Sequence, residues 1–445
     1  MGSHVDRGRP PTPPAISRRD LLRGTALGGV ALFLAACGAS PSPSSAPSSS
    51  GGFPSAVAPS EEPSIGPSAN TASPTPGPSA GPSLREKIAG LLVVGFRGSR
   101  LEQTPWLQTA LAETGLGGVI LFDRDQLTGA QRNVLSRRQV ATLVGDLRAA
   151  ARGREIIVSV DQEGGIVTRL SPNHGFPAVA SEAEIGRGTV AAARTWAKGI
   201  ASTLAEAGLN LNFAPVVDLD VNPRSPAIGA LDRSFSADPD VVVEMATVEI
   251  EAHRAAGVRT TLKHFPGIGS STTNTDFGVA DVTKTWTRTE LEPFSRLIAA
   301  GTADLVMAGH VVNGQLDPKY PASLSKAVVT DLLRGELGWQ GVVVTDDLQA
   351  AAITKRFGRD EAVLLALEAG NDLLLFANQQ VYDPKIVVRV VGVIADAVDA
   401  GRIPESRIDE AYVRVTRPSR PRPEAGISVG MPSRRRLPPR TMAAR

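Results

Sequence analysis

The sequence has one cysteine, little net charge and no long apolar run beyond its N-terminal region. Because Cys37 has no partner within the chain, an internal disulfide is excluded. The net charge of +2 argues against an extended nucleic-acid surface. A membrane-spanning helix needs about 20 consecutive apolar residues, and the rest of the chain has no such run. Its 42% hydrophobic and 21% charged residues are typical of a globular domain.

Motifs for two common kinds of site are also missing. The sequence contains no H-x-x-x-H or H-E-x-x-H pair, and no thiolate other than Cys37 is available to bind zinc. The segment LLVVGFRGS lacks the G-x-G-x-x-G pattern of a dinucleotide-binding turn. We therefore expect no metal and no organic cofactor. A hard-cation site built from scattered aspartates remains an alternative.

The first 37 residues have the features of an export signal. Arg18 and Arg19 precede the apolar stretch GTALGGVALFLAA, which ends at Cys37. This arrangement resembles a twin-arginine signal joined to a lipoprotein box, in which the cysteine becomes the lipidated first residue of the mature protein. We predict an exported cell-membrane lipoprotein that faces the cell wall and meets the membrane only through its lipid. An ordinary signal peptide or a short membrane anchor is the alternative.

Two segments have the composition of disordered chain. Residues 38–82 consist mainly of Ser, Pro, Ala and Gly, which bury too little apolar surface to offset the entropy of ordering. Residues 417–445 are rich in Pro and Arg without periodicity. We predict a flexible linker and a basic disordered tail, with a polyanion-binding tail as the alternative. Residues 83–416 are then expected to form one catalytic domain.

Eight short apolar runs alternate with longer amphipathic stretches in this central region. Such alternation is typical of βα units around a parallel sheet. The predicted strands are residues 91–96, 117–122, 155–161, 209–218, 260–265, 305–310, 341–347 and 371–376. Helical spacing recurs between them, as in TVAAARTWAKGIASTLAEAGL and VVVEMATVEIEAHRAAG. Eight such units in about 330 residues predict an α/β fold of the TIM (β/α)8 barrel type, and an open α/β sheet is the alternative.

A barrel of this type carries its chemistry at the carboxyl ends of the strands. Polar residues stand at the ends of five predicted strands: Asp161, Asp218, Lys263, His264, His310, Asp346 and Asp347. Any one of them could cap a helix or make a structural hydrogen bond. Together they predict a shared site at one rim, rich in carboxylates and with one lysine and two histidines.

This set of side chains suits chemistry on a sugar. Glycoside hydrolysis needs one carboxylate at the anomeric carbon and a proton donor at the leaving oxygen, and charged groups can hold the ring hydroxyls. The stretch DQEGGIVTRL adds a glycine pair just after a predicted strand. Gly164 and Gly165 could let the backbone approach a ligand closely, or could serve a tight turn alone.

The chain from about residue 84 to 416 resembles the single-domain β-N-acetylhexosaminidases of glycoside hydrolase family 3. The stretches that carry the resemblance are VDQEGGIVTRL, NFAPVVDLDVNPRSPAIGALDRSF, KHFPGIG, LVMAGHVV and GVVVTDDL. Several motifs in the family's order make the match specific. The resemblance implies a TIM barrel, a carbohydrate substrate, and a retaining reaction without cofactor.

The resemblance also implies roles for individual residues. It makes Asp346 the nucleophile that forms a glycosyl–enzyme intermediate. It assigns contacts with the sugar to Asp161, Arg233, Lys263 and His264, with Arg169 a weaker candidate. Supporting positions near the site fall to three further residues, Asp218, His310 and Asn274.

The loop after the fifth strand departs from the family pattern. The family loop usually runs K-H-F-P-G-H-G-D and closes with Asp-Ser-His, whose Asp and His act as the acid/base pair. Here the loop reads KHFPGIGSSTTNTD, so Asp276 stands where that histidine is expected. Asp276 could itself be the acid/base if its pKa rises from about 3.9 toward neutrality. Otherwise another loop supplies the acid, or turnover has been lost. The small residues before Asp276 also suggest a mobile lid or a plain surface loop.

These observations predict an enzyme that removes terminal β-linked N-acetylglucosamine, or a related hexosamine, from cell-wall fragments. A β-glucosidase or β-xylosidase of the same family is one alternative. A catalytically impaired, glycan-binding lipoprotein is the other.

Overall fold

The computed structural model describes residues 81–417. The predicted export signal with Cys37, the linker up to residue 80 and the tail from residue 418 lie outside the described residues. Within the described range, no helix combines the length and the hydropathy needed to cross a membrane.

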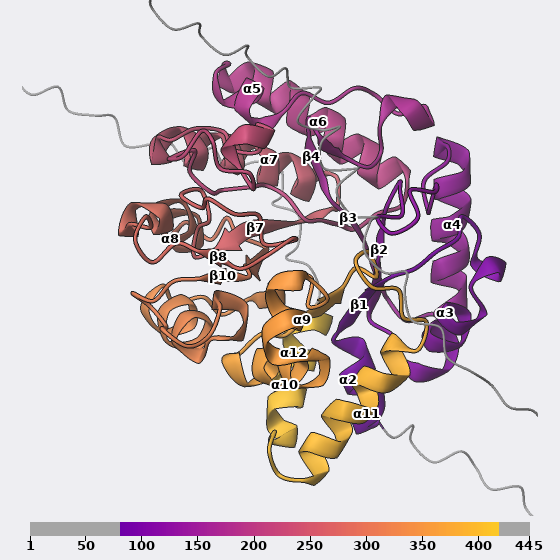
Figure 1. The fold of residues 1–445 in the computed structure, drawn as a ribbon. Coiled ribbons are helices and arrows are strands. Elements are labelled where there is room, and N and C mark those ends of the chain that lie inside the picture. The colour runs from indigo at the N-terminus through magenta and orange to yellow at the C-terminus, as the bar shows by residue number, and fades with distance from the viewer. Residues whose placement is uncertain (1–80, 418–445) are drawn as a thin grey trace, which may run out of the picture. The chain divides into compact units, whose positions relative to one another are not determined.

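Eight parallel strands form one sheet at the centre of the described chain (Figure 1). In sheet order they are β11 (Val342–Thr345), β9 (Leu305–Ala308), β7 (Arg259–Phe265), β6 (Leu211–Asn212), β3 (Ile157–Val160), β2 (Gly118–Leu121), β1 (Leu92–Gly95) and β12 (Leu374–Phe376). Each lies within, or within one residue of, a predicted strand, so the eight-strand prediction is confirmed. β6 is shorter than predicted because Pro215 has no N–H for the ladder, and pairing resumes only as a bridge between Val216 and Lys263.

The two outer strands of this order meet, so the sheet closes into a barrel. Val344 of β11 forms a parallel bridge with Leu373 beside β12, and the Thr345 N–H donates to the Leu373 carbonyl at 3.0 Å. Toward the amino-terminal ends of β11 and β12, the buried Asp372 carboxylate accepts hydrogen bonds from the Val343 N–H at 3.0 Å and from Arg334 at 2.6 Å. The predicted TIM barrel is thereby confirmed, and the open-sheet alternative is wrong.

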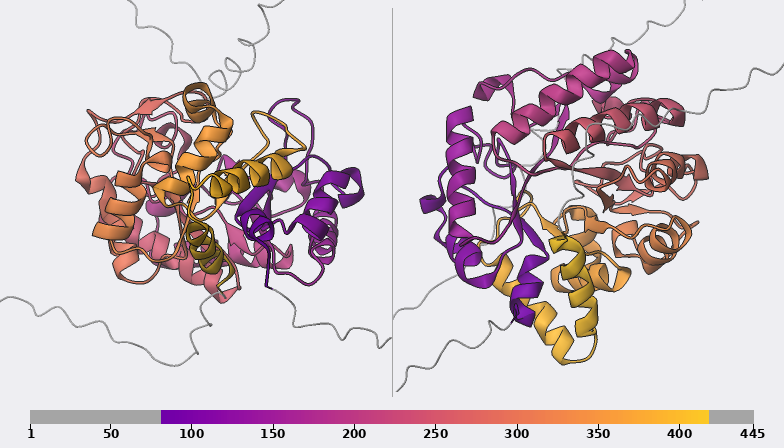
Figure 2. Two further views of the ribbon diagram at one scale, coloured as in Figure 1. Left: turned by 90° about the horizontal axis from the view of Figure 1, so that it is seen from below. Right: turned by 180° about the vertical axis from the view of Figure 1, so that it is seen from behind.

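Helices surround the strands on all sides (Figures 1 and 2). They are α2 (Leu84–Gly90), α3 (Pro105–Thr109), η2 (Ala110–Thr114), α4 (Arg137–Ala150), α5 (Glu182–Gly186), α6 (Val190–Glu206), α7 (Pro239–Ala255), α8 (Glu292–Ala299), η7 (Ala327–Glu336), α9 (Ala351–Phe357), α10 (Arg359–Ala369), α11 (Ile386–Asp399) and α12 (Glu405–Thr416). Several begin at a side chain that accepts an N–H of the first turn: Ser136 before α4, Thr189 before α6 and Asp238 before α7. Such caps satisfy donors that the helix itself leaves unpaired.

The strands are buried on both faces, which explains their continuous apolar sequences. All four residues of β1, β2, β3, β9 and β11 are buried. One face of each strand fills the barrel and the other packs under the helices. The charged residues of the predicted site therefore lie at or just beyond the strand ends.

Arg132 joins the carboxyl ends of the first and last strands. Its fully buried guanidinium donates to the carbonyls of Phe96 at 2.6 Å, Ala377 at 3.0 Å and Asn378 at 3.1 Å. Burial lowers the pKa of Arg132 to about 10, so the side chain remains charged at neutral pH. Three separate nitrogens of the planar fork reach these carbonyls, whereas the donors of a lysine ammonium group all radiate from one nitrogen.

We expect Arg132→Lys to lower the free energy of unfolding by about 2–4 kcal/mol, because buried carbonyls lose their donors. Urea unfolding followed by circular dichroism measures the change. The exposed Arg138 provides a matched control, and Arg138→Lys should stay within about 0.5 kcal/mol of wild type. Equal stability of the two variants would contradict a closing role for Arg132.

Candidate active site

The predicted site residues gather at the carboxyl ends of the strands. Asp161 directly follows β3, Lys263 and His264 lie near the end of β7, and Asp346 directly follows β11. Their side chains touch: Lys263 Nζ lies 2.8 Å from Asp161, and His264 Nδ1 lies 2.7 Å from Asp218. The shared rim that the sequence predicts is thus present.

Glu163 forms ion pairs with both Lys263 and Arg233. Its carboxylate, 1% exposed, lies 2.6 Å from Lys263 Nζ and accepts two hydrogen bonds of 2.8 Å from Arg233. Burial alone would raise the pKa of Glu163, but Arg233 and Lys263 outweigh it and hold this pKa well below its usual range. Burial also opposes the charge on Lys263, and Asp161 and Glu163 reverse that effect and raise the pKa of Lys263.

The sequence analysis missed Glu163, although a signal was present. Residues i and i+2 of an extended segment point to the same side, so Asp161 and Glu163 should face Lys263 together. The segment is extended, since Gln162–Gly164 forms β4 and pairs with β5 (Val167–Thr168). Alternation within DQEGG would therefore have identified the second carboxylate.

Asp218 positions the turn after β7. Its fully buried carboxylate lies at 2.7 Å from His264 Nδ1 and accepts from the backbone N–H groups of His264 at 3.0 Å and Ile268 at 2.8 Å. The other imidazole nitrogen, Nε2, lies 3.5 Å from Arg233. Asp218 therefore contacts His264 rather than solvent, which fits the supporting place predicted for it.

Asp346 and Asp347 face different surroundings, as alternation along a strand predicts. Burial would raise the pKa of Asp346, but His310, His264, the Asp347 N–H and Lys263 together keep it below the usual value. Burial raises the pKa of Asp347 to about 7. The Asp347 carboxylate accepts from the Gln349 and Ala377 N–H groups at 3.1 and 3.0 Å. Asp346 is consequently the more readily ionised carboxylate of the pair.

His310 supports this arrangement from the end of β9. Its ring nitrogens contact Ser323 Oγ and the Asp347 carbonyl, both at 2.7 Å. Burial lowers the pKa of His310, against the opposing charge of Asp346. The imidazole is therefore fixed in place beside the nucleophile candidate.

Asp276 lies within electrostatic reach of Asp346. Asn274 shapes the turn, because its side-chain oxygen accepts the Asp276 N–H at 3.0 Å and its carbonyl accepts the Phe277 N–H at 3.1 Å. Asp276 is exposed at the tip of the loop. Partial loss of hydration at the barrel mouth and the charge of Asp346 raise the pKa of Asp276, and Arg233 and His264 oppose the rise in part.

The base of the Asp276 loop is held more firmly than its composition suggests. Ser270, Ser271 and Thr275 are buried. The Ser271 carbonyl accepts from the Asn222 side chain at 3.0 Å, and the Ser270 N–H donates to Glu290 at 3.2 Å. The loop thus has polar anchors in place of bulky ones, and motion of its tip stays a prediction.

The glycine pair and Arg169, both singled out in the sequence, can now be placed. A Cβ on Gly164 would lie 2.2 Å from the Ala180 carbonyl, and one on Gly165 would lie 2.7 Å from Ser181. Both glycines also have positive φ, so turn geometry and close packing account for the pair without a ligand.

Arg169 lies beside the end of β2, where it forms an ion pair with Asp123 at 3.8 Å. Within the described residues it makes no ion pair with Glu163 or Asp218.

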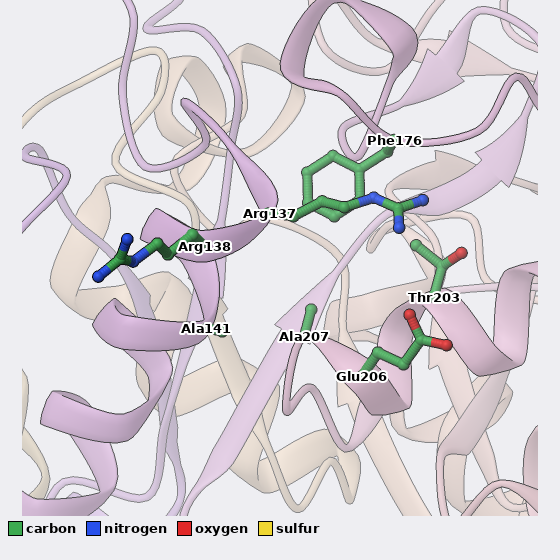
Figure 3. A pocket seen from close by; sticks show the side chains of 7 residues that line it. All are labelled: Arg137, Arg138, Ala141, Phe176, Thr203, Glu206 and Ala207. Carbon is green, nitrogen blue, oxygen red and sulfur yellow. The ribbon is translucent and has the colours of Figure 1, made fainter.

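No group of three or more His, Cys, Asp or Glu side chains within residues 81–417 is arranged to hold a metal ion. A cavity of about 230 Å³ lies elsewhere, between α4 and the end of α6. Arg137 packs against the ring of Phe176 there, and Arg138 points away from it (Figure 3). The cavity contains none of the rim residues named above.

Comparison with known proteins identifies the family of this chain. Residues 83–418 match the glycosyl hydrolase family 3 N-terminal domain. The chain belongs to glycosyl hydrolase family 3. It is 31% identical over 365 residues to β-hexosaminidase A of Pseudoalteromonas piscicida, covering 75% of this chain and 59% of the relative. It is 37% identical over 302 residues to a β-hexosaminidase of Xanthomonas oryzae pv. oryzae, covering 65% of this chain and 84% of the relative.

Solved structures give the same family. A family 3 β-N-acetylglucosaminidase from Paenibacillus sp. str. FPU-7 matches with a TM-score of 0.68 and 34% identity, over 79% of this chain and 65% of that one. A β-N-acetylhexosaminidase from Beutenbergia cavernae DSM 12333 matches with a TM-score of 0.68 and 33% identity, over 76% and 98% of the two chains. The family 3 chain therefore spans less than two thirds of the Pseudoalteromonas and Paenibacillus proteins.

Glu290 lies under the loop that carries Asp276. It belongs to η5 (Arg288–Leu291) and is 1% exposed. One oxygen accepts the Ser270 N–H, while the other has no partner among the described residues. Burial raises the pKa of Glu290 to about 7. Ionisation of Glu290 therefore opposes folding of the wild-type chain.

We expect the stability of Glu290→Gln relative to wild type to increase with pH. Below pH 4.5 Glu290 is protonated in both states; between 4.5 and about 7 its ionisation favours the unfolded chain. The relative free energy of unfolding should grow by up to about 3 kcal/mol between pH 4.5 and 8. Urea unfolding at both pH values measures it. The exposed Glu292 gives a control, since Glu292→Gln should show no such trend, and a pH-independent Glu290→Gln difference would contradict the buried-acid account.

Proposed function

We propose that this chain removes terminal β-linked N-acetylglucosamine, or a related hexosamine, from cell-wall fragments with retention of configuration. One observation carries the proposal. The pKa of Asp346 at the end of β11 is kept low by His310, His264, the Asp347 N–H and Lys263 against the effect of burial, while the pKa of Asp276 on the loop after β7 is raised. Membership of family 3 and the β-hexosaminidase relatives support the choice of sugar. The residues named supply the whole reaction without a cofactor.

In the first step Asp346 attacks the anomeric carbon while the glycosidic C–O bond breaks. Asp276 donates its proton to the leaving oxygen, so the second sugar departs as a neutral alcohol. In the second step Asp276, now ionised, takes a proton from water. The water oxygen bonds to the anomeric carbon, the ester bond to Asp346 breaks, and both carboxyl groups return to their starting states.

Three basic side chains of the site hold the sugar while this happens. Lys263, His264 and Arg233 lie at the mouth on β7 and the β6–α7 loop, with Asp161 beside Lys263 as an acceptor. Hydroxyl groups of the terminal ring would donate to Asp161 and accept from these N–H donors. Glu163 keeps Lys263 and Arg233 in place, and Arg169 is a weaker sugar contact.

The place of the reaction is inferred from the sequence. An export signal ending in a lipidated Cys37 would tether the enzyme to the outer face of the cell membrane. The substrate is then a glycan fragment of the wall, and the lipid is the contact with the membrane.

The replaced family histidine favours one second candidate, a glycan-binding lipoprotein with little turnover. It would keep the sugar-binding cations and lack an effective acid. Family 3 enzymes also act on other β-linked sugars, so a β-glucosidase or β-xylosidase activity belongs in the same test.

Asp346→Ala should lower kcat/KM for nitrophenyl β-N-acetylglucosaminide by at least about a thousandfold, because the intermediate cannot form. Azide should restore release of nitrophenol and give the α-configured glycosyl azide, since a small anion can attack from the vacated side. Nitrophenol absorbance and NMR of the product measure both effects. If the wild-type chain binds sugar but turns over none of the N-acetylglucosaminide, glucoside and xyloside, the enzyme proposal is wrong and the glycan-binding protein is favoured.

Asp276→Ala should affect a disaccharide far more than an aryl glycoside, because nitrophenolate leaves without protonation. We expect a loss of about a hundredfold or more in kcat/KM for N,N′-diacetylchitobiose and less than about tenfold for the nitrophenyl substrate. The exposed Asp281 provides a control, and Asp281→Ala should leave both rates unchanged. Equal losses for both substrates would show that Asp276 is not the acid.

A further inference from the structure

The exposed apolar side chains are concentrated on one side of the barrel mouth. Six of the eight large hydrophobic side chains exposed within residues 81–417 lie on loops that follow strands β2, β3, β6 and β7. We call these six the apolar half-rim: Leu127, Leu135, Ile166, Val221, Phe277 and Val279. The other two, Val388 and Val413, lie on helices α11 and α12.

The half-rim lies on neighbouring loops of the fold although its residues are scattered in the sequence. Strands β7, β6, β3 and β2 are consecutive neighbours in the barrel. The loops after β9, β11, β12 and β1 contribute no exposed large hydrophobic side chain within the described range. The exposed large hydrophobic side chains of the mouth therefore lie on the half that does not carry Asp346.

The chemistry of the site places the leaving group against this half. A retaining nucleophile attacks the face of the sugar opposite to the leaving group. Asp346 follows β11, on the far side of β9 from β7, while Asp276 stands on the loop after β7. The proton donor must reach the glycosidic oxygen, so the departing sugar lies beside Asp276.

Phe277 is the residue best placed to meet that sugar. It directly follows Asp276, and its N–H donates to the Asn274 carbonyl in the same turn. It is 66% exposed and is the one aromatic residue of the half-rim. An exposed phenyl ring has no folding reason to face water, and pyranose rings present an apolar C–H face on which aromatic rings stack.

We propose that the apolar half-rim is the leaving-group subsite, and that Phe277 stacks on the second sugar ring of a β-linked glycan. This subsite rests on the proposed function, because it takes the leaving group of that reaction. Phe277 is a residue that determines preference for the second sugar. Ile166 and Val221, 52% and 44% exposed on neighbouring loops, extend the apolar surface away from the acid.

The test compares binding of one and two sugar rings to the full chain carrying Asp346→Asn, which prevents turnover. Titration calorimetry with N-acetylglucosamine and N,N′-diacetylchitobiose gives the ratio of the two dissociation constants. We expect the disaccharide to bind more tightly than the monosaccharide. Phe277→Ala should reduce this preference about tenfold, a size typical of one aromatic contact, and Phe277→Tyr should restore it.

Val388→Ala is the matched control, because it truncates a side chain that is 72% exposed on α11. It should leave the preference unchanged. If Phe277→Ala also leaves the preference unchanged, or if the disaccharide binds no better than the monosaccharide, the subsite is wrong. If Phe277→Ala instead loses binding to phosphatidylglycerol vesicles and keeps its sugar preference, the half-rim binds a lipid surface and the proposal is overturned. Failure of the proposed function is seen separately, as absence of turnover by the chain with Asp346 intact.

Discussion

The candidate site depends on one buried carboxylate, Glu163. Lys263 and Arg233 enter the barrel mouth from different elements, and two cations so close together would repel each other and lose their hydration. Glu163 contacts both within 2.8 Å and compensates both charges. Removing one partner of such a buried group leaves an uncompensated charge, which costs several kcal/mol, about 3–5. The two cations proposed to bind the sugar are thus fixed before any substrate arrives, so binding does not have to order them.

The two carboxyl groups proposed for catalysis are set apart by their surroundings. Asp346 lies among imidazole, ammonium and N–H groups, which lower its pKa, whereas partial loss of hydration and the charge of Asp346 raise the pKa of Asp276. The two pKa values are shifted in opposite directions, as the separate roles of nucleophile and acid require. Asp276 stands on the loop after β7, two strands from β11 in the barrel, and this loop also belongs to the apolar half-rim.

Much of this organisation could be predicted from the sequence. Continuous apolar runs separated by amphipathic stretches identify eight buried strands, and parallel strands bring their carboxyl ends to one rim. Asp161, Lys263, His264 and Asp346 follow directly from that rule. The short form of β6 and the polar anchoring of the Asp276 loop do not, because they depend on Pro215 interrupting a ladder and on Glu290 arriving from a distant turn.

The sequence by itself determined the barrel, the strand ends and the residue types at each end, because these follow from local periodicity and the position of polar residues within it. Tertiary structure alone decided which charges meet. Glu163 forms ion pairs with Lys263 and Arg233, and Asp218 contacts the His264 ring. Arg132 donates hydrogen bonds to the ends of both the first and the last strand. Such pairings depend on distances of a few ångströms between segments up to about 250 residues apart, since Coulomb and hydrogen-bond energies fall steeply over that range.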